Sequence, residues 1–317
     1  MIQILEERNF PVDRIRFLAS SRSAGKKLPF KNADITVEEL TQDSFEKGEL
    51  VLSSPGGSVS KWYVSSAVKA GALIIDNTSA FRMDDNVPLV VPEVNPEEAH
   101  RHQGVISNPN CSTIQMVVVL KPIYDIAKIR RVVVSTYQAV SGAGIAAINE
   151  LREQSKAIIE GGVYEPDVFP HQIAFNCLPQ IPQKNAFGPN LYSEEEMKMV
   201  NETRKIMNDP SILISVTTVR VPVLTGHSES VNVETKRKIT RDEAVAALKK
   251  APGVTVLDDP SAGIYPLASE AEGKDDTFVG RIREDISHDR ALDMWIVSDN
   301  LRKGAALNTV QIAELFL

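Results

Sequence analysis

The sequence lacks the features of exported, disulfide-bonded and membrane-spanning proteins. Only two cysteines, Cys111 and Cys177, occur among 317 residues, which is typical of a reducing compartment. The apolar runs are far shorter than the roughly 20 residues that a membrane helix needs. The first residues, MIQILEERNFP, contain no basic region followed by an apolar stretch. We therefore expect a cytoplasmic protein that does not bind a membrane.

An excess of positive charge is also missing. The chain has 35 lysines and arginines against 42 aspartates and glutamates, which gives a net charge of −7. Binding to nucleic acid is not expected, because no basic field is available to displace phosphate counterions. An anionic ligand would need local Arg and Lys side chains. No metal site is expected.

Length and composition indicate two globular domains. Domains commonly run to about 100–200 residues, and 43% hydrophobic with 24% charged residues is an ordinary composition. In residues 1–113, short β-branched runs alternate with helical patterns, which predicts a parallel α/β domain. The strand-like segments are residues 14–20, 33–40, 48–54, 72–77, 87–95 and 104–110.

The rest of the chain predicts a second domain that is rich in antiparallel strands. Residues 131–137 and 211–223 are long β-rich runs, whereas residues 160–189 contain repeated Pro, Gly and Asn and predict an irregular, interface-forming excursion. Residues 303–316 have the spacing of an amphipathic helix, which can return to cover the first domain. The predicted domains are residues 1–113 with 299–317, and residues 114–298.

The most informative segment is SNPNCST at residues 107–113, which a helical pattern follows. Cys111 is therefore predicted to lie at a helix N-terminus. The unpaired N–H groups and helix dipole there favour the thiolate, the form that attacks carbonyl groups, and could also bind an oxyanion. Cys177 has no comparable helix after it, and we interpret it as structural.

The SNPNCST segment resembles the nucleophile motif of aspartate-semialdehyde dehydrogenases. Further segments that resemble this family follow in order: LASSRSAGK, DNTSAFRM, VVPEVN, YQAVSGAG, NETRKI, RVPVLTGHSES and SDNLRKGAALNTVQIAE. The resemblance implies an α/β fold like that of glyceraldehyde-3-phosphate dehydrogenase. Such a fold has a Rossmann-like NADP-binding domain with a parallel sheet, an α+β catalytic and dimerisation domain, and a homodimeric or homotetrameric assembly.

The resemblance also implies a reaction. In the family, a thiolate attacks the aldehyde of aspartate semialdehyde, a hydride passes to NADP, and phosphate cleaves the thioester to give aspartyl phosphate. The reverse direction serves the biosynthesis of lysine, diaminopimelate, threonine and methionine. Aspartate semialdehyde, phosphate and aspartyl phosphate are therefore the expected small-molecule partners.

The family motifs assign roles to individual residues. Cys111 matches the nucleophile, His227 the general base and Gln138 the residue that orients the substrate. Arg220 would hold the substrate carboxylate through a bidentate pair. The other implied substrate contacts are Glu202 for the ammonium group, and Lys205, Arg82 and Asn110 for the phosphate.

The matching cofactor segments favour NADP. After the first strand-like segment, an acidic residue would bind a ribose 2′-hydroxyl, but this sequence has a turn that suits a 2′-phosphate, formed by Ser20, Ser21, Arg22 and Ser23. The backbone of Ser54, Pro55 and Gly56 would approach the adenosine. Ser141, Gly142 and Asn300 match family contacts near the nicotinamide.

One part of the family pattern is missing from the sequence. Rossmann domains of this family begin with a strand and a glycine-rich turn that brings the pyrophosphate to a helix N-terminus, whereas residues 2–11 resemble the helix after that turn. Without this central strand, two neighbouring strands would keep unpaired edges. We expect lower stability and weaker NADP binding, caused by a misassigned start codon or a real truncation.

Other functions remain open on the sequence alone. An enzyme like N-acetylglutamyl-phosphate reductase would use similar thiol and acyl-phosphate chemistry, but ETRK and RVPVLTGHSES favour the aspartyl substrate. A noncatalytic truncated homologue could act as an interaction subunit, although the retention of Cys111, His227, Gln138 and Arg220 weighs against it. A thiol hydrolase without NADP would leave SSRSAG and SPGG without a use.

Overall fold

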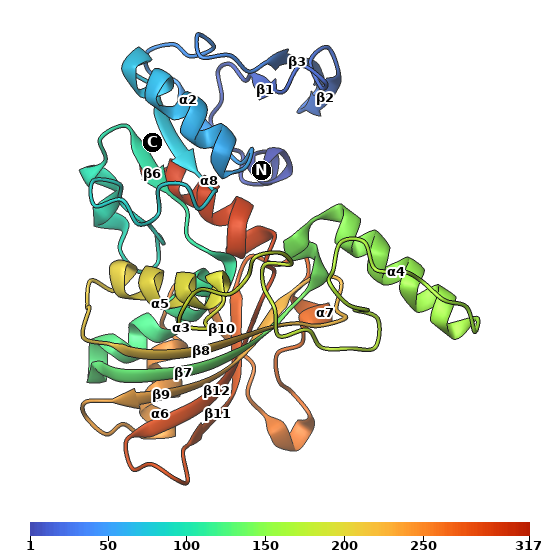
Figure 1. Ribbon diagram of the computed structural model, residues 1–317. Coiled ribbons are helices and arrows are strands. Elements are labelled where there is room, and N and C mark those ends of the chain that lie inside the picture. The colour runs from blue at the N-terminus through green and yellow to red at the C-terminus, as the bar shows by residue number, and fades with distance from the viewer. The chain divides into compact units, whose positions relative to one another are not determined.

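The computed structural model describes residues 1–317 as two compact units. The first unit comprises Met1–Pro109 and Ala306–Leu317, and the second comprises Asn110–Ala305. Each unit has its own sheets and helices (Figure 1). No helix is long and apolar enough to cross a membrane.

The first unit contains two three-stranded sheets. One is parallel, in the order β4-β5-β6, and the other has the order β1-β3-β2, with β1 parallel and β2 antiparallel to β3. The strands are β1 (Phe17–Ala19), β2 (Lys27–Phe30), β3 (Ala33–Glu39), β4 (Leu50–Ser53), β5 (Leu73–Asp76) and β6 (Val105–Ser107). The predicted parallel sheet is thus present in two parts.

Strands β1 and β4 are edge strands of these two sheets. They nevertheless contribute to the same two apolar layers, since Phe17 and Leu52 pack against one cluster and Leu18 and Val51 against the other. Strands β2 and β6 are the other two edges, so the expectation of two strands left unpaired by a missing strand stays a prediction.

Helices cover the sheets of the first unit. Helix α2 (Gly57–Ala70) is the crossover helix between the parallel strands β4 and β5, and Gly71 ends it in a left-handed conformation with φ of 91°. Helix α8 (Leu307–Glu314) packs its apolar residues in one cluster with Ile75 and Ile106, so the C-terminal helix does return to the first unit. The unit also contains α1 (Ile2–Glu7) and η1 (Pro96–Arg101).

The predicted strand at residues 87–95 is wrong. Only Leu89 forms an isolated bridge, because the two prolines of VPLVVPEVN have no N–H for a ladder. The Asn95 side chain accepts the N–H of Val91 at 2.9 Å and donates to the Leu89 carbonyl oxygen at 3.0 Å. These bonds stabilise a turn instead.

The second unit is built on a six-stranded mixed sheet in the order β10-β11-β12-β9-β7-β8. The three central pairings, β11-β12, β12-β9 and β9-β7, are antiparallel, which confirms the expectation from the β-rich sequence. The strands are β7 (Ile129–Gln138), β8 (Leu213–Arg220), β9 (His227–Thr235), β10 (Val254–Val256), β11 (Thr277–Glu284) and β12 (Ala291–Ser298).

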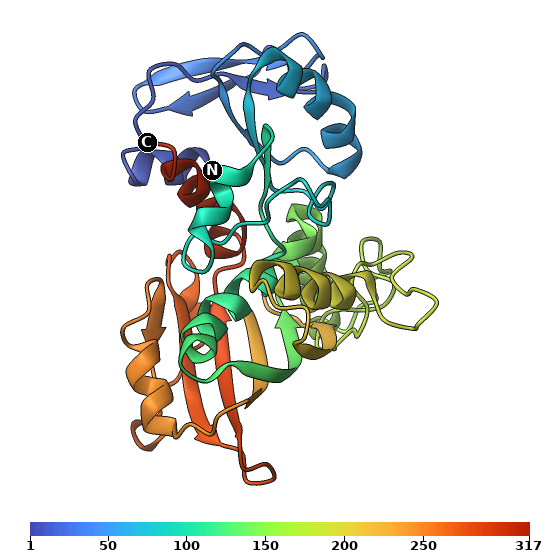
Figure 2. The same cartoon turned by 90° about the vertical axis from the view of Figure 1, so that its left-hand side faces the viewer.

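One face of this sheet is covered by a layer of three helices, α3, α5 and α6, with α3 in the middle of the layer (Figures 1 and 2). Helix α4 projects away from the sheet (Figure 1), and the irregular segment predicted at residues 160–189 follows it. The helical elements of this unit are α3 (Cys111–Ala127), α4 (Ile145–Ile159), α5 (Glu194–Ile206), α6 (Arg241–Leu248), α7 (Ala268–Ala271), η2 (Val140–Ala143) and η3 (Pro260–Ala262). A π-helical turn, Arg302–Ala306, leads toward α8.

Candidate active site

Cys111 is the first residue of α3, as the sequence predicts. Asn110 caps this helix, because its side-chain oxygen accepts the N–H groups of Ser112 at 3.0 Å and Thr113 at 3.2 Å. The fixed first turn directs the positive end of the helix dipole toward the thiol. This position stabilises a thiolate relative to a thiol.

Two buried carboxylates of α5 hold the start of α3. Glu202 accepts the backbone N–H of Asn110 at 2.6 Å, and Glu195 accepts the Asn110 side-chain amide at 2.8 Å. Glu195 also accepts a hydrogen bond from the Gln138 amide at 3.3 Å. Lys205 lies on α5 as well, three residues after Glu202. Glu195, which the sequence did not indicate, therefore links two predicted site residues, Asn110 and Gln138, and two more, Glu202 and Lys205, lie on the same helix.

The remaining catalytic candidates form a row across the sheet. Gln138 ends β7 and pairs in register with Arg220, which ends β8. His227 begins β9 and pairs with Ser298 at the end of β12. Because cross-strand neighbours lie about 5 Å apart, these chain ends bring Gln138, Arg220 and His227 together, as the sequence-based assignment requires.

Arg220 is buried beside the thiol. Its Nη1 atom donates to the Ala139 carbonyl oxygen at 2.7 Å. Burial lowers the pKa of Arg220, whereas the negative charges of Glu195 and Cys111 act in the opposite direction. The guanidinium group is thus electrostatically coupled to the Cys111 sulfur, and a cation at this place favours the thiolate.

His227 is fully buried, and its ring is oriented by the backbone. The Nδ1 atom accepts the N–H of Ala139 at 3.1 Å. Burial first, and then the charge of Arg220, lower the pKa of His227 well below its ordinary value, against a weaker effect of the Gly226 backbone. The ring is therefore neutral near pH 7, and the Nδ1 contact leaves the ring proton on Nε2.

The predicted nicotinamide contacts border this pair. A Cβ atom at Gly142 would lie 2.9 Å from Nη1 of Arg220 and 3.3 Å from Nε2 of His227, so a larger residue would force these two side chains to shift. Ser141, its neighbour, accepts a hydrogen bond from the Asn300 amide at 3.0 Å. Gly142 thus lies beside His227, and Ser141 and Asn300 are hydrogen-bonded next to it; their contact with the nicotinamide stays a prediction.

The first unit contains the other predicted site residues. Arg82 is mostly buried and donates to the Asn77 carbonyl oxygen at 3.1 Å. The Asn77 side chain accepts the Asn108 amide at 2.7 Å and donates to the Ser54 hydroxyl at 3.3 Å. These residues follow the carboxyl ends of β4, β5 and β6, the edge at which parallel α/β sheets bind ligands.

The predicted cofactor segments form two turns of the first unit. Pro55 and Gly56 are exposed directly before α2, and Gly56 precedes the helix with a φ of 107° that favours glycine. Ser20, Ser21 and Arg22 form an exposed turn after β1, and Ser23 is half-buried. Both turns have short or flexible side chains that would let a phosphate or ribose approach.

Four residues near the site were missed by the sequence analysis. A Cβ atom at Gly304 would lie 2.9 Å from Cβ of Cys111, so the π-helical turn packs directly on the nucleophile. Glu195, Gln115 and Glu229 are buried polar side chains around α3. Glu229 could have been found from its spacing, since it lies two residues after His227 and therefore on the same face of β9.

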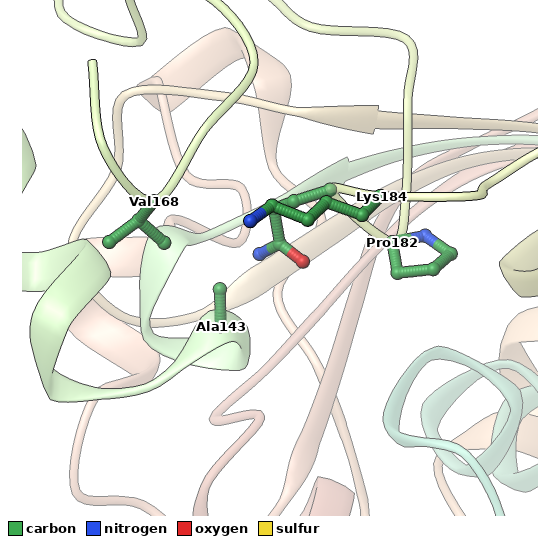
Figure 3. A pocket seen from close by; sticks show the side chains of 5 residues that line it. Ala143, Val168, Pro182 and Lys184 are labelled. Atoms are coloured by element: carbon green, nitrogen blue, oxygen red, sulfur yellow. The ribbon is translucent and has the colours of Figure 1, made fainter. Parts of the chain in front are cut away.

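A shallow depression of the second unit is lined by Ala143, Val168, Pro182, Gln183 and Lys184 (Figure 3). None of them is a predicted site residue, although Ala143 directly follows Gly142 in the sequence. The depression opens widely to solvent.

Comparison with known proteins places these residues in a family. Residues 1–102 match the sequence model of the semialdehyde dehydrogenase NAD-binding domain, and residues 120–303 match that of the semialdehyde dehydrogenase dimerisation domain. The chain is 55% identical to an aspartate-semialdehyde dehydrogenase of Aquifex aeolicus, with 100% of this chain and 93% of that protein covered.

Solved structures give the same result. The fold matches aspartate semialdehyde dehydrogenase II of Vibrio cholerae, a structure complexed with ASA, with a TM-score of 0.94 and 47% identity over 99% of this chain and 93% of that chain. It also matches the Candida albicans aspartate semialdehyde dehydrogenase, a structure with NADP, with a TM-score of 0.75 and 25% identity over 99% and 94% of the two chains.

Proposed function

Because the chain belongs to the aspartate-semialdehyde dehydrogenase family, an oxidoreductase family of amino-acid biosynthesis, we propose that it converts L-aspartyl 4-phosphate reversibly to L-aspartate 4-semialdehyde through a thioester on Cys111. The observation that carries this proposal is the position of Cys111 at the capped start of α3, coupled to the buried Arg220. An activated thiol of this kind suits acyl transfer.

In the oxidative direction, the Cys111 thiolate attacks the aldehyde carbon of aspartate semialdehyde. A carbon–sulfur bond forms, and the carbonyl oxygen becomes an alkoxide. We propose that the Nε2–H group of His227 donates a hydrogen bond to this oxygen, because the Nδ1 atom is already engaged by Ala139. In this tautomer neither ring nitrogen is free to accept the thiol proton, so the proposed hydrogen-bond role replaces the general-base role that the family motif implies. The N–H groups at the start of α3 are the second source of stabilisation.

The alkoxide then collapses to the thioester, and a bound nicotinamide nucleotide supplies the acceptor for the departing hydride. Phosphate attacks the thioester carbon, and the Cys111 thiolate leaves with the electron pair of the carbon–sulfur bond. The low pKa of His227 fits this sequence, because a neutral ring keeps its Nε2 proton and can stabilise the alkoxide by a hydrogen bond in both directions without transferring that proton.

Substrate recognition is proposed for the charged side chains around the thiol. Arg220 would bind the substrate carboxylate, Glu202 its ammonium group and Lys205 the phosphate. Gln138, held by Glu195 at 3.3 Å, would orient the carbonyl group. Arg82 of the first unit is proposed as a further phosphate ligand, and Asn110 contributes through the helix cap that it forms.

The first unit contains the nicotinamide-nucleotide-binding domain of the family, and we propose that NADP is its cofactor. The exposed turn with Arg22 offers a cation and hydroxyl groups to a 2′-phosphate and no carboxylate to a 2′-hydroxyl. The relative from Candida albicans was solved with NADP. Glycines and serines at both turns fit a dinucleotide, and they leave room for its phosphates.

The test of the reaction is the phosphate-dependent reduction of NADP by aspartate semialdehyde. Without phosphate, mass spectrometry should find an acyl adduct on the Cys111 peptide, and phosphate should release it. Cys111→Ser should lower the rate at least 1,000-fold, whereas Cys177→Ala, a change at the exposed second cysteine, should retain it. Equal rates in wild type and Cys111→Ser would overturn the proposed mechanism.

Cofactor choice has its own test. Arg22→Asp should lower kcat/KM for NADP relative to NAD by roughly 10- to 100-fold, which corresponds to the loss of one charge-assisted hydrogen bond of about 1.5–3 kcal/mol. Arg14→Asp makes the same change of charge at another exposed position and serves as the control. A ratio that moves equally in both variants would contradict the assignment of Arg22.

The second unit contains the dimerisation domain of the family, and we propose a homodimer. Helix α4 and the irregular segment after it expose large apolar side chains, which is unusual for a free surface. The residues are Ile145, Ile159, Val163, Phe175 and Leu191, which are 65–87% exposed. Light scattering distinguishes dimer from tetramer, and Ile159→Glu with Val163→Glu should shift the protein to monomers.

A further inference from the structure

A second row of side chains lies directly behind the row that contains His227. Two residues further along β9 is Glu229, which pairs in register with Thr136 on β7 and Ile296 on β12. Glu229 is completely buried. Like His227, it points to the face of the sheet that α3 covers, because side chains alternate along a strand.

On helix α3, Cys111 and Gln115 have a spacing that matches the spacing of His227 and Glu229 on β9. Gln115 lies four residues after Cys111, one helical turn away, and is also completely buried. Four residues of helix span about 6 Å, and two residues of strand span about 6.7 Å. Because these two spacings are nearly equal, and because Cys111 lies above the row of His227, Gln115 lies above the row of Glu229.

The side chains of Gln115 and Glu229 face each other in this second row. The Gln115 amide lowers the pKa of Glu229, but burial acts more strongly, so the pKa of Glu229 is raised well above its ordinary value. No hydrogen bond of normal geometry is completed by either side chain. A protonated carboxyl group and a primary amide each offer a donor and an acceptor, so they are complementary partners.

We propose that Glu229 positions the Cys111 thiol opposite His227 by holding the Gln115 side chain of α3. Asn110 and its carboxylate partners fix the first turn of the helix, and the Gln115–Glu229 pair fixes the second turn on the strand that carries His227. Two attachment points prevent the helix from pivoting. A misplacement of about 1 Å can lower a rate 100-fold, so the second attachment has catalytic consequences.

The thiol itself reports this position, because its ionisation depends on the charges around it. The charged and titratable groups on the elements packed at this end of α3 are Arg220 on β8, His227 on β9, Glu195, Glu202 and Lys205 on α5, and the buried Lys303 on the π-helical turn. Movement of the helix away from Arg220 would raise the thiol pKa. The inference rests on the proposed nucleophilic role of Cys111, and the alkylation rate of wild-type Cys111 tests that role separately.

The experiment measures the rate of Cys111 alkylation by iodoacetamide against pH in a Cys177→Ala background. Glu229→Leu should lower the rate at pH 7 about tenfold and raise the midpoint by about one pH unit, with a similar loss of kcat and little change in KM for phosphate. Gln115→Met keeps the helix and should give the same result. Glu229→Gln, a match for the protonated acid, should stay within about threefold of wild type.

Glu150→Leu is the matched control, because Glu150 is a buried glutamate of α4 that holds the backbone of residues 167–169. It should lower the melting temperature without changing the alkylation profile. The double exchange Gln115→Glu with Glu229→Gln should restore most of the rate. Unchanged alkylation in folded Glu229→Leu and Gln115→Met would overturn the proposal. A wild-type Cys111 as slow as an ordinary thiol would instead contradict the proposed function.

Discussion

Asn110 gives the sharpest test of how the nucleophile is built. Its side chain makes three hydrogen bonds: two cap the start of α3, and the third, at 2.8 Å, goes to the buried carboxylate of Glu195. Loss of a cap destabilises by about 0.5–2 kcal/mol, and loss of a hydrogen bond to a buried charged group by about 1.5–3 kcal/mol. Asn110→Ala should therefore destabilise the second unit by roughly 2–5 kcal/mol.

For a unit of this size, the melting temperature should fall by roughly 4–20 °C. Calorimetry in phosphate-free buffer measures it. The frayed first turn should also slow Cys111 alkylation. Asn110→Ser is the informative comparison, because a serine oxygen keeps the cap but donates nothing to Glu195 across the longer gap. We expect it to lose about half as much stability and to keep most of the alkylation rate.

The explanation is refuted if Asn110→Ala lowers the melting temperature by less than about 2 °C, since at least one of the three bonds would then contribute nothing. It also fails if Asn110→Ser slows alkylation as much as Asn110→Ala, because the cap would then not determine the reactivity of the thiol.

Two further predictions follow from the packing and the pKa values. Gly142→Ala would put a Cβ atom 2.9 Å from Nη1 of Arg220, so kcat/KM for aspartate semialdehyde should fall at least tenfold with little loss of stability. Gly144→Ala is the control, because a Cβ atom there meets nothing within 4 Å. This second change should lower stability alone, through the positive φ of residue 144. The pKa of Glu229 is raised in the folded protein, so the unfolded chain releases this proton at a lower pH than the folded protein does. The contribution of Glu229 to the free energy of unfolding therefore falls as the pH rises above the ordinary glutamate range. The fall amounts to at most about 1.4 kcal/mol per pH unit. The melting temperature of Glu229→Gln minus that of wild type should therefore increase between about pH 5 and pH 8. The difference isolates Glu229, because the titration of His227 is common to both proteins. A difference that stays constant with pH would contradict the assignment.

Local sequence signals predicted the elements that carry the site. The start of α3 at Cys111 could be predicted because Asn110 is a capping residue and a helical pattern follows it. The end of α2 could be predicted from Gly71. In contrast, the prediction of a strand at residues 87–95 was wrong, because it relied on their apolar composition and gave too little weight to the two prolines. The turn that forms instead depends on a hydrogen bond between Val91 and the side chain of Asn95, four residues apart.

The missed site residues depend on contacts between distant parts of the chain. Glu195 stands in a run of three glutamates, and nothing local distinguishes the one that turns toward Asn110, which is 85 residues away. Gly304 is special only because Cys111 packs against it. Glu229 differs, because its spacing from His227 predicts a buried carboxyl group once β9 is known to begin at the histidine.

The return of α8 to the first unit has a consequence for synthesis on the ribosome. The second unit is one uninterrupted segment, whereas the first unit combines residues 1–109 with residues 306–317. Leu307, Val310 and Ile312 of α8 belong to the cluster that covers Ile75 and Ile106. The apolar cluster of the first unit therefore cannot be completed until residues 110–305 have been synthesised, so the two segments of this unit meet across the whole length of the second unit.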